Sequence, residues 1–255
     1  MVYPDWKRAA MDGWLSVEDL TQLGFARSPV VMANEAHSGL TRCVRTREVG
    51  VRIIQAAHQA GVRRLAMEAL PSPADDAPGP IREIPSRDDG YLAQPDMRTL
   101  ITTALELGWT LWAYEATIDI RKSQAEHLSL EFTNWREREQ ARNLCQVVAA
   151  VHGDPLLVWC GNGHASRKGG DGWIPMGHHF AATSGIQQFV IDQTVTVDFT
   201  GRGPDQWLRD LLAELGGTLA AHGGHAGILR DQAPPPLDCW AGVDAVVVST
   251  ENELT

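Results

Sequence analysis

The sequence lacks several features that mark particular protein classes. It has four cysteines and no CxxC pair, so neither a disulfide framework nor a zinc knuckle is indicated. It also lacks a basic surplus, because 22 Lys and Arg stand against 32 Asp and Glu, for a formal net charge of −10. Phosphate-backbone surfaces need clustered Lys and Arg, so nucleic acid is not an expected partner.

No apolar run approaches the roughly 20 residues that cross a bilayer, so we expect no membrane partner. The first residues, MVYPDWKRAAMDGW, contain no apolar core, which predicts a cytoplasmic location with reduced thiols rather than secretion. The chain does have 255 residues, of which 44% are hydrophobic and 21% charged, as in soluble globular proteins. This length predicts one domain over 1–255, with a helical extension at 1–28.

From residue 29 onward, short apolar runs alternate with amphipathic stretches, as strands alternate with helices. The expected strands are 29–34, 62–68, 109–114, 155–160, 187–191 and 243–249. The expected helices are 41–60, 96–107 (with Asp96 as N-cap), 133–151 and 204–215. The order predicts an α/β fold: an open, mostly parallel sheet flanked by helices on both faces. Residues 71–95, rich in Pro, Asp and Gly, are expected to form a long loop and a candidate lid.

Polar residues follow the expected strands where each strand ends. In an open parallel sheet, ligands bind at the carboxyl ends of the strands. The residues at these ends are Glu35 and His37, Glu68, Glu115, His164 in Gly161-Asn162-Gly163-His164, and Gln193. We therefore expect these acids and imidazoles to converge on one edge of the sheet.

Several of these residues also have a purely structural interpretation. Glu35 is typical of a helix cap, and Glu115 of a solvated strand end. Glu68 has apolar neighbours, so its carboxylate needs a partner or a raised pKa. His164 is the strongest candidate, because the flanking glycines let a ligand approach the backbone closely. Cys160 is expected to be a buried thiol rather than a nucleophile.

Charged residues of the 133–151 helix mostly indicate a solvated face with ion pairs. The rows Arg138/Arg142 and Glu139/Asn143 are expected to turn one arginine and one acid toward the strand ends.

Other histidines and tryptophans leave two interpretations open. At most one of the adjacent His178 and His179 is expected at the site, and His222 and His225 are expected in a surface turn. Tryptophans such as Trp173 either line a cleft for an apolar ligand or pack in the core.

Taken in order, these residues resemble a known superfamily. The quoted segments are Asn34-Glu35-Ala36-His37, Glu68, Arg138-Glu139 with Asn143, Gly161-Asn162-Gly163-His164, Met176-Gly177 and Ile191-Asp192-Gln193. They look like the motifs of the erythromycin esterases, the ChaN haem-binding proteins and the Tiki/TraB-type proteins. The resemblance covers residues 29 to about 195. It implies an α/β fold with a polar site at the strand ends.

The esterase branch implies roles for these residues. His164 resembles the general base that activates water, with His37 and Glu68 orienting it, Glu35 nearby, and Arg138 stabilising the oxyanion. The esterase pattern usually reads Gly-Glu-x-x-His, whereas Asn34 stands in place of the glycine and one residue separates Glu35 from His37. This spacing is closer to the ChaN and Tiki branches.

The leading prediction is a hydrolase of an ester, lactone or amide bond in a small-molecule substrate. One alternative is a hydrolase that uses Zn, Mn or Co, with candidate ligands Glu35, His37, Glu115 and His164. Another is a protein that binds haem or a small ligand without turnover, and a third is a degenerate scaffold. The residues expected to contact substrate are Glu115, Glu139, Asn143, Trp173, His178 and Gln193.

Overall fold

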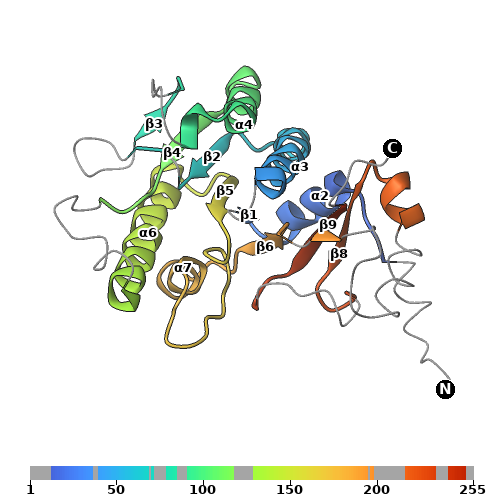
Figure 1. Cartoon of the computed structure of the whole chain (residues 1–255). Helices are drawn as coiled ribbons and strands as arrows, with labels where there is room; N and C mark the ends of the chain where they lie inside the picture. The colour runs from blue at the N-terminus through green and yellow to red at the C-terminus, as the bar shows by residue number, and fades with distance from the viewer. Residues whose placement is uncertain are drawn as a thin grey trace.

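The computed structural model describes residues 13–36, 40–68, 70–71, 79–84, 91–117, 129–194, 196–197, 216–233 and 241–250. Their strands form one sheet (Figure 1). In spatial order the strands are β3 (Pro80–Ile81), β4 (Thr110–Ala113), β2 (Arg64–Met67), β5 (Leu156–Gly161), β1 (Val30–Glu35), β6 (Phe189–Asp192), β9 (Ala245–Thr250) and β7 (Thr196–Val197), with β8 (His225–Leu229) paired to β9. Within these ranges, no helix is long and apolar enough to cross a membrane.

Most pairings in the sheet are parallel, as the alternation of strands and helices predicts. β4, β2, β5, β1, β6, β9 and β7 run in one direction, whereas β3 and β8 are antiparallel to their partners. The four strands β4, β2, β5 and β1 are neighbours, so residues that follow them lie on the same edge.

Side chains of the strands alternate between two buried faces. In β1, Val30 and Met32 belong to one apolar core, and Val31 and Ala33 belong to the other. The first core packs against α6 (Leu130–Ala150) and α7 (Met176–Ser184). The second packs against α2 (Val17–Arg27), α3 (Leu40–Gln59) and α4 (Pro95–Glu106). Helices therefore cover both faces of the sheet, which confirms the predicted α/β architecture (Figure 1).

Local chemistry sets several helix ends. Ser16 and Ser129 cap α2 and α6 by accepting backbone N–H groups in the first turn of each helix. The prediction that Asp96 is the N-cap of α4 is wrong. The cap is Gln94 and Pro95 is the first residue of the helix, while the Asp96 carboxylate pairs with Arg47.

Other differences from the sequence prediction concern short or polar segments. The expected loop at 71–95 contains β3 and a 3₁₀ turn, Tyr91–Ala93, while 72–78 and 85–90 lie outside the described residues. The expected helix 204–215 also lies outside them. His225 is not in a surface turn but in β8, where burial, the largest influence, lowers its pKa to about 4.

Helix α2 is part of the core. α2 lies within the predicted helical extension at 1–28, and its Val17 and Leu20 are fully buried against the sheet. Trp109 and Trp112 are also core residues, which favours the packing interpretation of these two tryptophans.

Gly50 of α3 provides a test of how tightly the second core is packed. A Cβ atom at this position would lie 2.4 Å from Trp159 and 2.6 Å from Leu100. We expect Gly50→Ala to lower the free energy of unfolding by about 1–3 kcal/mol, although alanine favours helix by roughly 1 kcal/mol. Urea unfolding measures the change. Gly79→Ala, where a Cβ meets open space, is the control, and a Gly50→Ala protein as stable as wild type would contradict this packing.

Candidate functional site

Three neighbouring strands deliver polar side chains to one end of α6. Glu68 directly follows β2, Glu115 lies two residues after β4, and His164 lies three residues after β5. Because β4, β2 and β5 are adjacent and parallel, their carboxyl ends meet at one edge of the sheet. The expected convergence of Glu68, Glu115 and His164 is therefore present, with α6 supplying the residues between them.

A buried carboxylate from α6 orients His164. The Nδ1 atom of His164 lies 2.6 Å from Oε1 of Glu137, whose side chain has no exposed surface. Glu137 also accepts hydrogen bonds from the indole N–H of Trp173, at 2.9 Å, and from the backbone N–H of Met176. An ionised carboxylate can only accept, so Nδ1 carries the proton and a neutral ring leaves Nε2 free to act as a base.

The opposite side of the imidazole faces a second carboxylate. Nε2 of His164 is 3.9 Å from Oε1 of Glu68, which is too long for a direct hydrogen bond and short enough for one water to contact both. Burial alone lowers the pKa of His164, but the Glu68 charge and the bond to Glu137 outweigh it, so this pKa is raised. The His164 side chain is 15% exposed, so part of it contacts solvent.

Arg136 holds the two strand-end glutamates together. Its Nη2 lies 2.6 Å from Glu68 Oε1 and also pairs with Glu115, while its Nε donates to Glu115 over 3.0 Å. Gln140 donates to both oxygens of Glu115 at 3.1 Å, and Gly161 donates its backbone N–H to Glu68 at 2.8 Å.

The two glutamates have opposite pKa shifts for physical reasons. Burial raises the pKa of Glu68, but His164 and Arg136 together outweigh it and lower this pKa to about 2. Burial is the largest influence on Glu115, and its pKa stays raised despite the bonds from Arg136. Both glutamates raise the pKa of Arg136, against the opposite effect of its burial. Arg136 therefore lies between the carboxylates of Glu115 and Glu68, and the imidazole of His164 lies between Glu68 and Glu137.

Glu35 contacts the other helical layer. Its buried carboxylate accepts bonds from Arg47 of α3 and from the indole of Trp159, each at 3.0 Å. It therefore anchors α3 to the end of β1, whereas Glu68, Glu115 and His164 bond to α6. His37, predicted to stand beside it, lies outside the described residues.

The expectation for Arg138 and Glu139 is corrected by the structure. Arg138 is exposed, and Glu139 pairs with Arg142 on the helix surface. The arginine and acid that face the strand ends are Arg136 and Glu137, each two residues earlier in the helix.

The other residues expected to contact substrate lie in different places. Asn143 donates to the carbonyls of Tyr114 and Glu115 at 3.2 and 3.1 Å, and so fixes the end of β4. The Trp173 ring meets His164 edge-on, with centroids 6.4 Å apart. His178 is exposed and its Nδ1 lies 3.1 Å from the carbonyl of Arg167, away from the cluster. Gln193 is buried, and no described residue bonds to its side-chain amide.

Sequence reasoning missed Glu137, although a signal for it was present. The buried positions of α6 include Phe132, Glu137, Ala141, Leu144 and Val147, which follow the helical repeat. A glutamate at an apolar-face position must have partners, because an unpaired buried charge is very costly. Glu137 could therefore have been singled out from the periodicity of the helix.

The described residues do not fit a metal centre. No group of three or more His, Cys, Asp or Glu side chains in these ranges is arranged to hold an ion. The guanidinium of Arg136 already occupies the position between Glu68 and Glu115 where a cation would be held.

By sequence, no protein-family profile and no curated protein matches the chain. Solved structures similar to it include the type III effector HopBA1, at 15% identity and a TM-score of 0.47, covering 93% of this chain and 94% of that one. Two structures described as bacterial protein toxins are similar at 14% and 15% identity, with TM-scores of 0.44 and 0.41. They cover 74% and 73% of this chain and 38% of each toxin chain.

Removing Arg136 tests the electrostatics of the cluster. Arg136→Met leaves Glu68 and Glu115 partly buried without their cation, so we expect a loss of about 2–4 kcal/mol in unfolding free energy near neutral pH. In wild type, the lowered pKa of Glu68 gives stability above its ordinary value of 4.5 that is lost as pH falls toward 2. In the variant, protonation of Glu68 and Glu115 removes the buried charges that lack a cation. The difference in unfolding free energy between wild type and variant should therefore become smaller as the pH is lowered.

Urea unfolding over a pH series measures this difference. The exposed Arg138→Met is the control with the same charge change on the same helix, and it should cost no more than about 0.5 kcal/mol. A pH-independent loss for Arg136→Met would contradict the proposed pairing.

Proposed function

We propose that the protein is a hydrolase that cleaves an ester, lactone or amide bond in a small-molecule substrate, with His164 as general base. The observation that carries this proposal is the bond of His164 Nδ1 to the fully buried Glu137, which leaves Nε2 as the basic atom at the partly exposed end of the cluster. A histidine held in one tautomer by a carboxylate is a recurrent arrangement for activating a nucleophile near neutral pH.

In the proposed reaction, Nε2 of His164 takes a proton from a water molecule that it shares with Glu68. The resulting hydroxide attacks the carbonyl carbon of the substrate, and a tetrahedral oxyanion forms. The imidazolium, stabilised by Glu137 and Glu68, then gives the proton to the departing oxygen or nitrogen. This makes Glu137 a positioning residue and His164 the catalytic one.

Arg136 takes the place that the resemblance assigned to Arg138. Its Nε and Nη2 bond to Glu115 and Glu68, while Nη1 has no hydrogen-bond partner in the described part of the chain. With 24% of its side chain exposed, Arg136 can direct Nη1 toward an oxyanion next to His164. The likeness to the motifs of erythromycin esterases supports the same reaction class.

The setting of the reaction is part of the proposal. Cys160 is a buried free thiol and Cys145 a half-buried one, which agrees with a reducing compartment. We therefore propose that the protein acts in the cytoplasm.

Kinetic measurements with ester, lactone and anilide panels test this function. We expect His164→Ala to lower kcat by about a hundredfold or more, the usual contribution of a general base. Glu137→Gln should lower kcat by at least about tenfold with little change in KM, because it disturbs the imidazole rather than substrate binding. In wild type, kcat/KM should rise with pH through a value above 6.5, since His164 must lose its proton and its pKa is raised.

The matched control is Glu139→Gln, which removes the same charge from an ion pair on the surface of α6. It should retain activity within about twofold of wild type. The proposal fails if wild type hydrolyses none of the panel, or if His164→Ala is as active as Glu139→Gln.

A further inference from the structure

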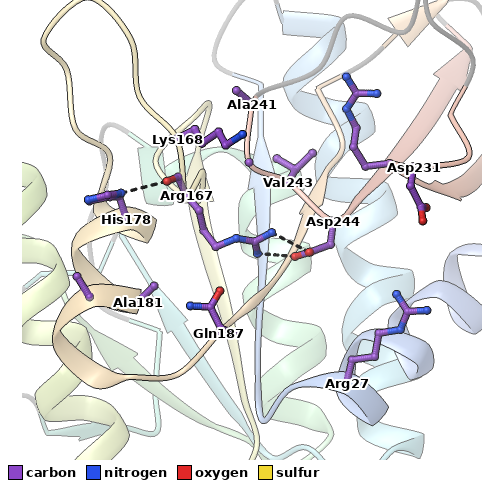
Figure 2. A pocket seen from close by; sticks show the side chains of 13 residues that line it. Arg27, Arg167, Lys168, His178, Ala181, Gln187, Asp231, Ala241, Val243 and Asp244 are labelled. Carbon is purple, nitrogen blue, oxygen red and sulfur yellow. Dashed lines mark hydrogen bonds and ion pairs between the residues drawn. The ribbon is translucent and has the colours of Figure 1, made fainter.

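A concave site lies apart from the His164 cluster. A pocket of about 960 Å³ lies between α7, the end of α2 and the loops before β6 and β9. Figure 2 shows the side chains that line it. Gln187 and Asp244 precede β6 and β9, so this pocket is at the amino ends of these strands, opposite the carboxyl ends that define the candidate active site. None of Glu68, Glu137 and His164 lines it.

The pocket is positively charged in a negatively charged protein. Arg27, Arg167, Lys168 and Arg230 line it against only two carboxylates, Asp231 and Asp244, so it carries a formal excess of two positive charges. The whole chain carries −10. A local excess of this sign attracts anions from solution.

Most of these cations have no side-chain partner among the residues that the structure describes. Arg167 forms a two-point pair with Asp244 at 2.6 and 2.7 Å in the middle of the pocket (Figure 2). In the described part of the chain, the side chains of Lys168 and Arg230 have no hydrogen bond or ion pair, and Arg27 only lies over the ring of Phe189, at 5.9 Å. Three cationic groups are thus available to a ligand.

The backbone beneath these groups is fixed. Gly242 has a φ of +75°, and a Cβ there would lie 2.7 Å from the backbone nitrogen of Lys168, so the two loops are in direct contact. The Asp244 carboxylate accepts a hydrogen bond from the backbone N–H of Val190 at 2.8 Å. The backbone carbonyl of Asp244 accepts one from the backbone N–H of Arg230, also at 2.8 Å. The side chains of Lys168 and Arg230 therefore extend from backbone that close contacts and hydrogen bonds hold in place.

We propose that this pocket binds a small organic phosphate, attracted by the cationic side chains of Lys168, Arg230 and Arg27 along its walls. A phosphate monoester carries close to two negative charges at neutral pH, which matches the excess in the pocket. The volume exceeds that of the phosphate alone, and Ala181, Ala182 and Val243 provide an apolar wall for the organic part. The carbonyl substrate proposed for the His164 site is a different ligand at a different site.

Calorimetric titration with phenylphosphonate, a phosphate group mimic on an apolar ring, tests the proposal. We expect wild type to bind it, and more weakly as salt is added, because the cations are exposed. The double variant Lys168→Gln, Arg230→Gln should bind at least about tenfold more weakly, since it loses two charge-assisted contacts. The single variant Arg230→Gln, at an exposed position, should fold normally and bind about threefold or more weakly.

The matched control is Arg138→Gln, Arg142→Gln, which removes the same charge from exposed positions on α6 and should bind within about twofold of wild type. His164→Ala should also bind like wild type, so the result does not depend on the hydrolase proposal. Failure of wild type to bind at about 5 mM, or an equal loss of binding in the α6 control, would overturn the proposal.

Discussion

The buried carboxylate of Glu137 is the interaction on which the rest of the site depends. It bonds to three points of the chain after β5: His164 and Trp173 in the loop between β5 and α7, and Met176 at the start of α7. A charge without exposed surface is costly unless it is fully bonded, and Glu137 has three donors. The hydrogen bond from Nδ1 of His164, which helps to stabilise the buried Glu137 carboxylate, therefore also fixes the orientation of the imidazole.

Its neighbour in sequence, Arg136, organises the other half of the site. The adjacent side chains of Arg136 and Glu137 contact different strand ends, because successive positions on a helix point in different directions. Arg136 neutralises Glu68 and Glu115, which otherwise repel each other beside β2 and β4. The single helix α6 therefore turns three strand ends into one polar cluster, whereas Glu35 on β1 serves the opposite layer through Arg47.

The sequence predicted the sheet well because apolar runs and helical periods report burial directly. It also placed Glu68, Glu115 and His164 at one edge, since parallel strands end together. It did not predict β8, whose His225 and glycines read as a turn, because pairing with β9 is a long-range effect. The sequence analysis selected Arg138 rather than Arg136. Several charged residues lie on the surface of this helix, and which of them faces the strands depends on how the helix packs on the sheet, which the sequence does not show.

Imidazole NMR tests most directly whether Glu137 sets the protonation state of His164. In wild type we expect His164 to titrate above 6.5, with the neutral ring protonated at Nδ1. Burial and the positive charge of Arg136 both lower the pKa of His164, and the Glu137→Gln variant loses one of the two carboxylates that raise it. In this variant the pKa of His164 should therefore fall, and the preference for the Nδ1 tautomer should weaken. An unchanged pKa and tautomer in Glu137→Gln would contradict the account.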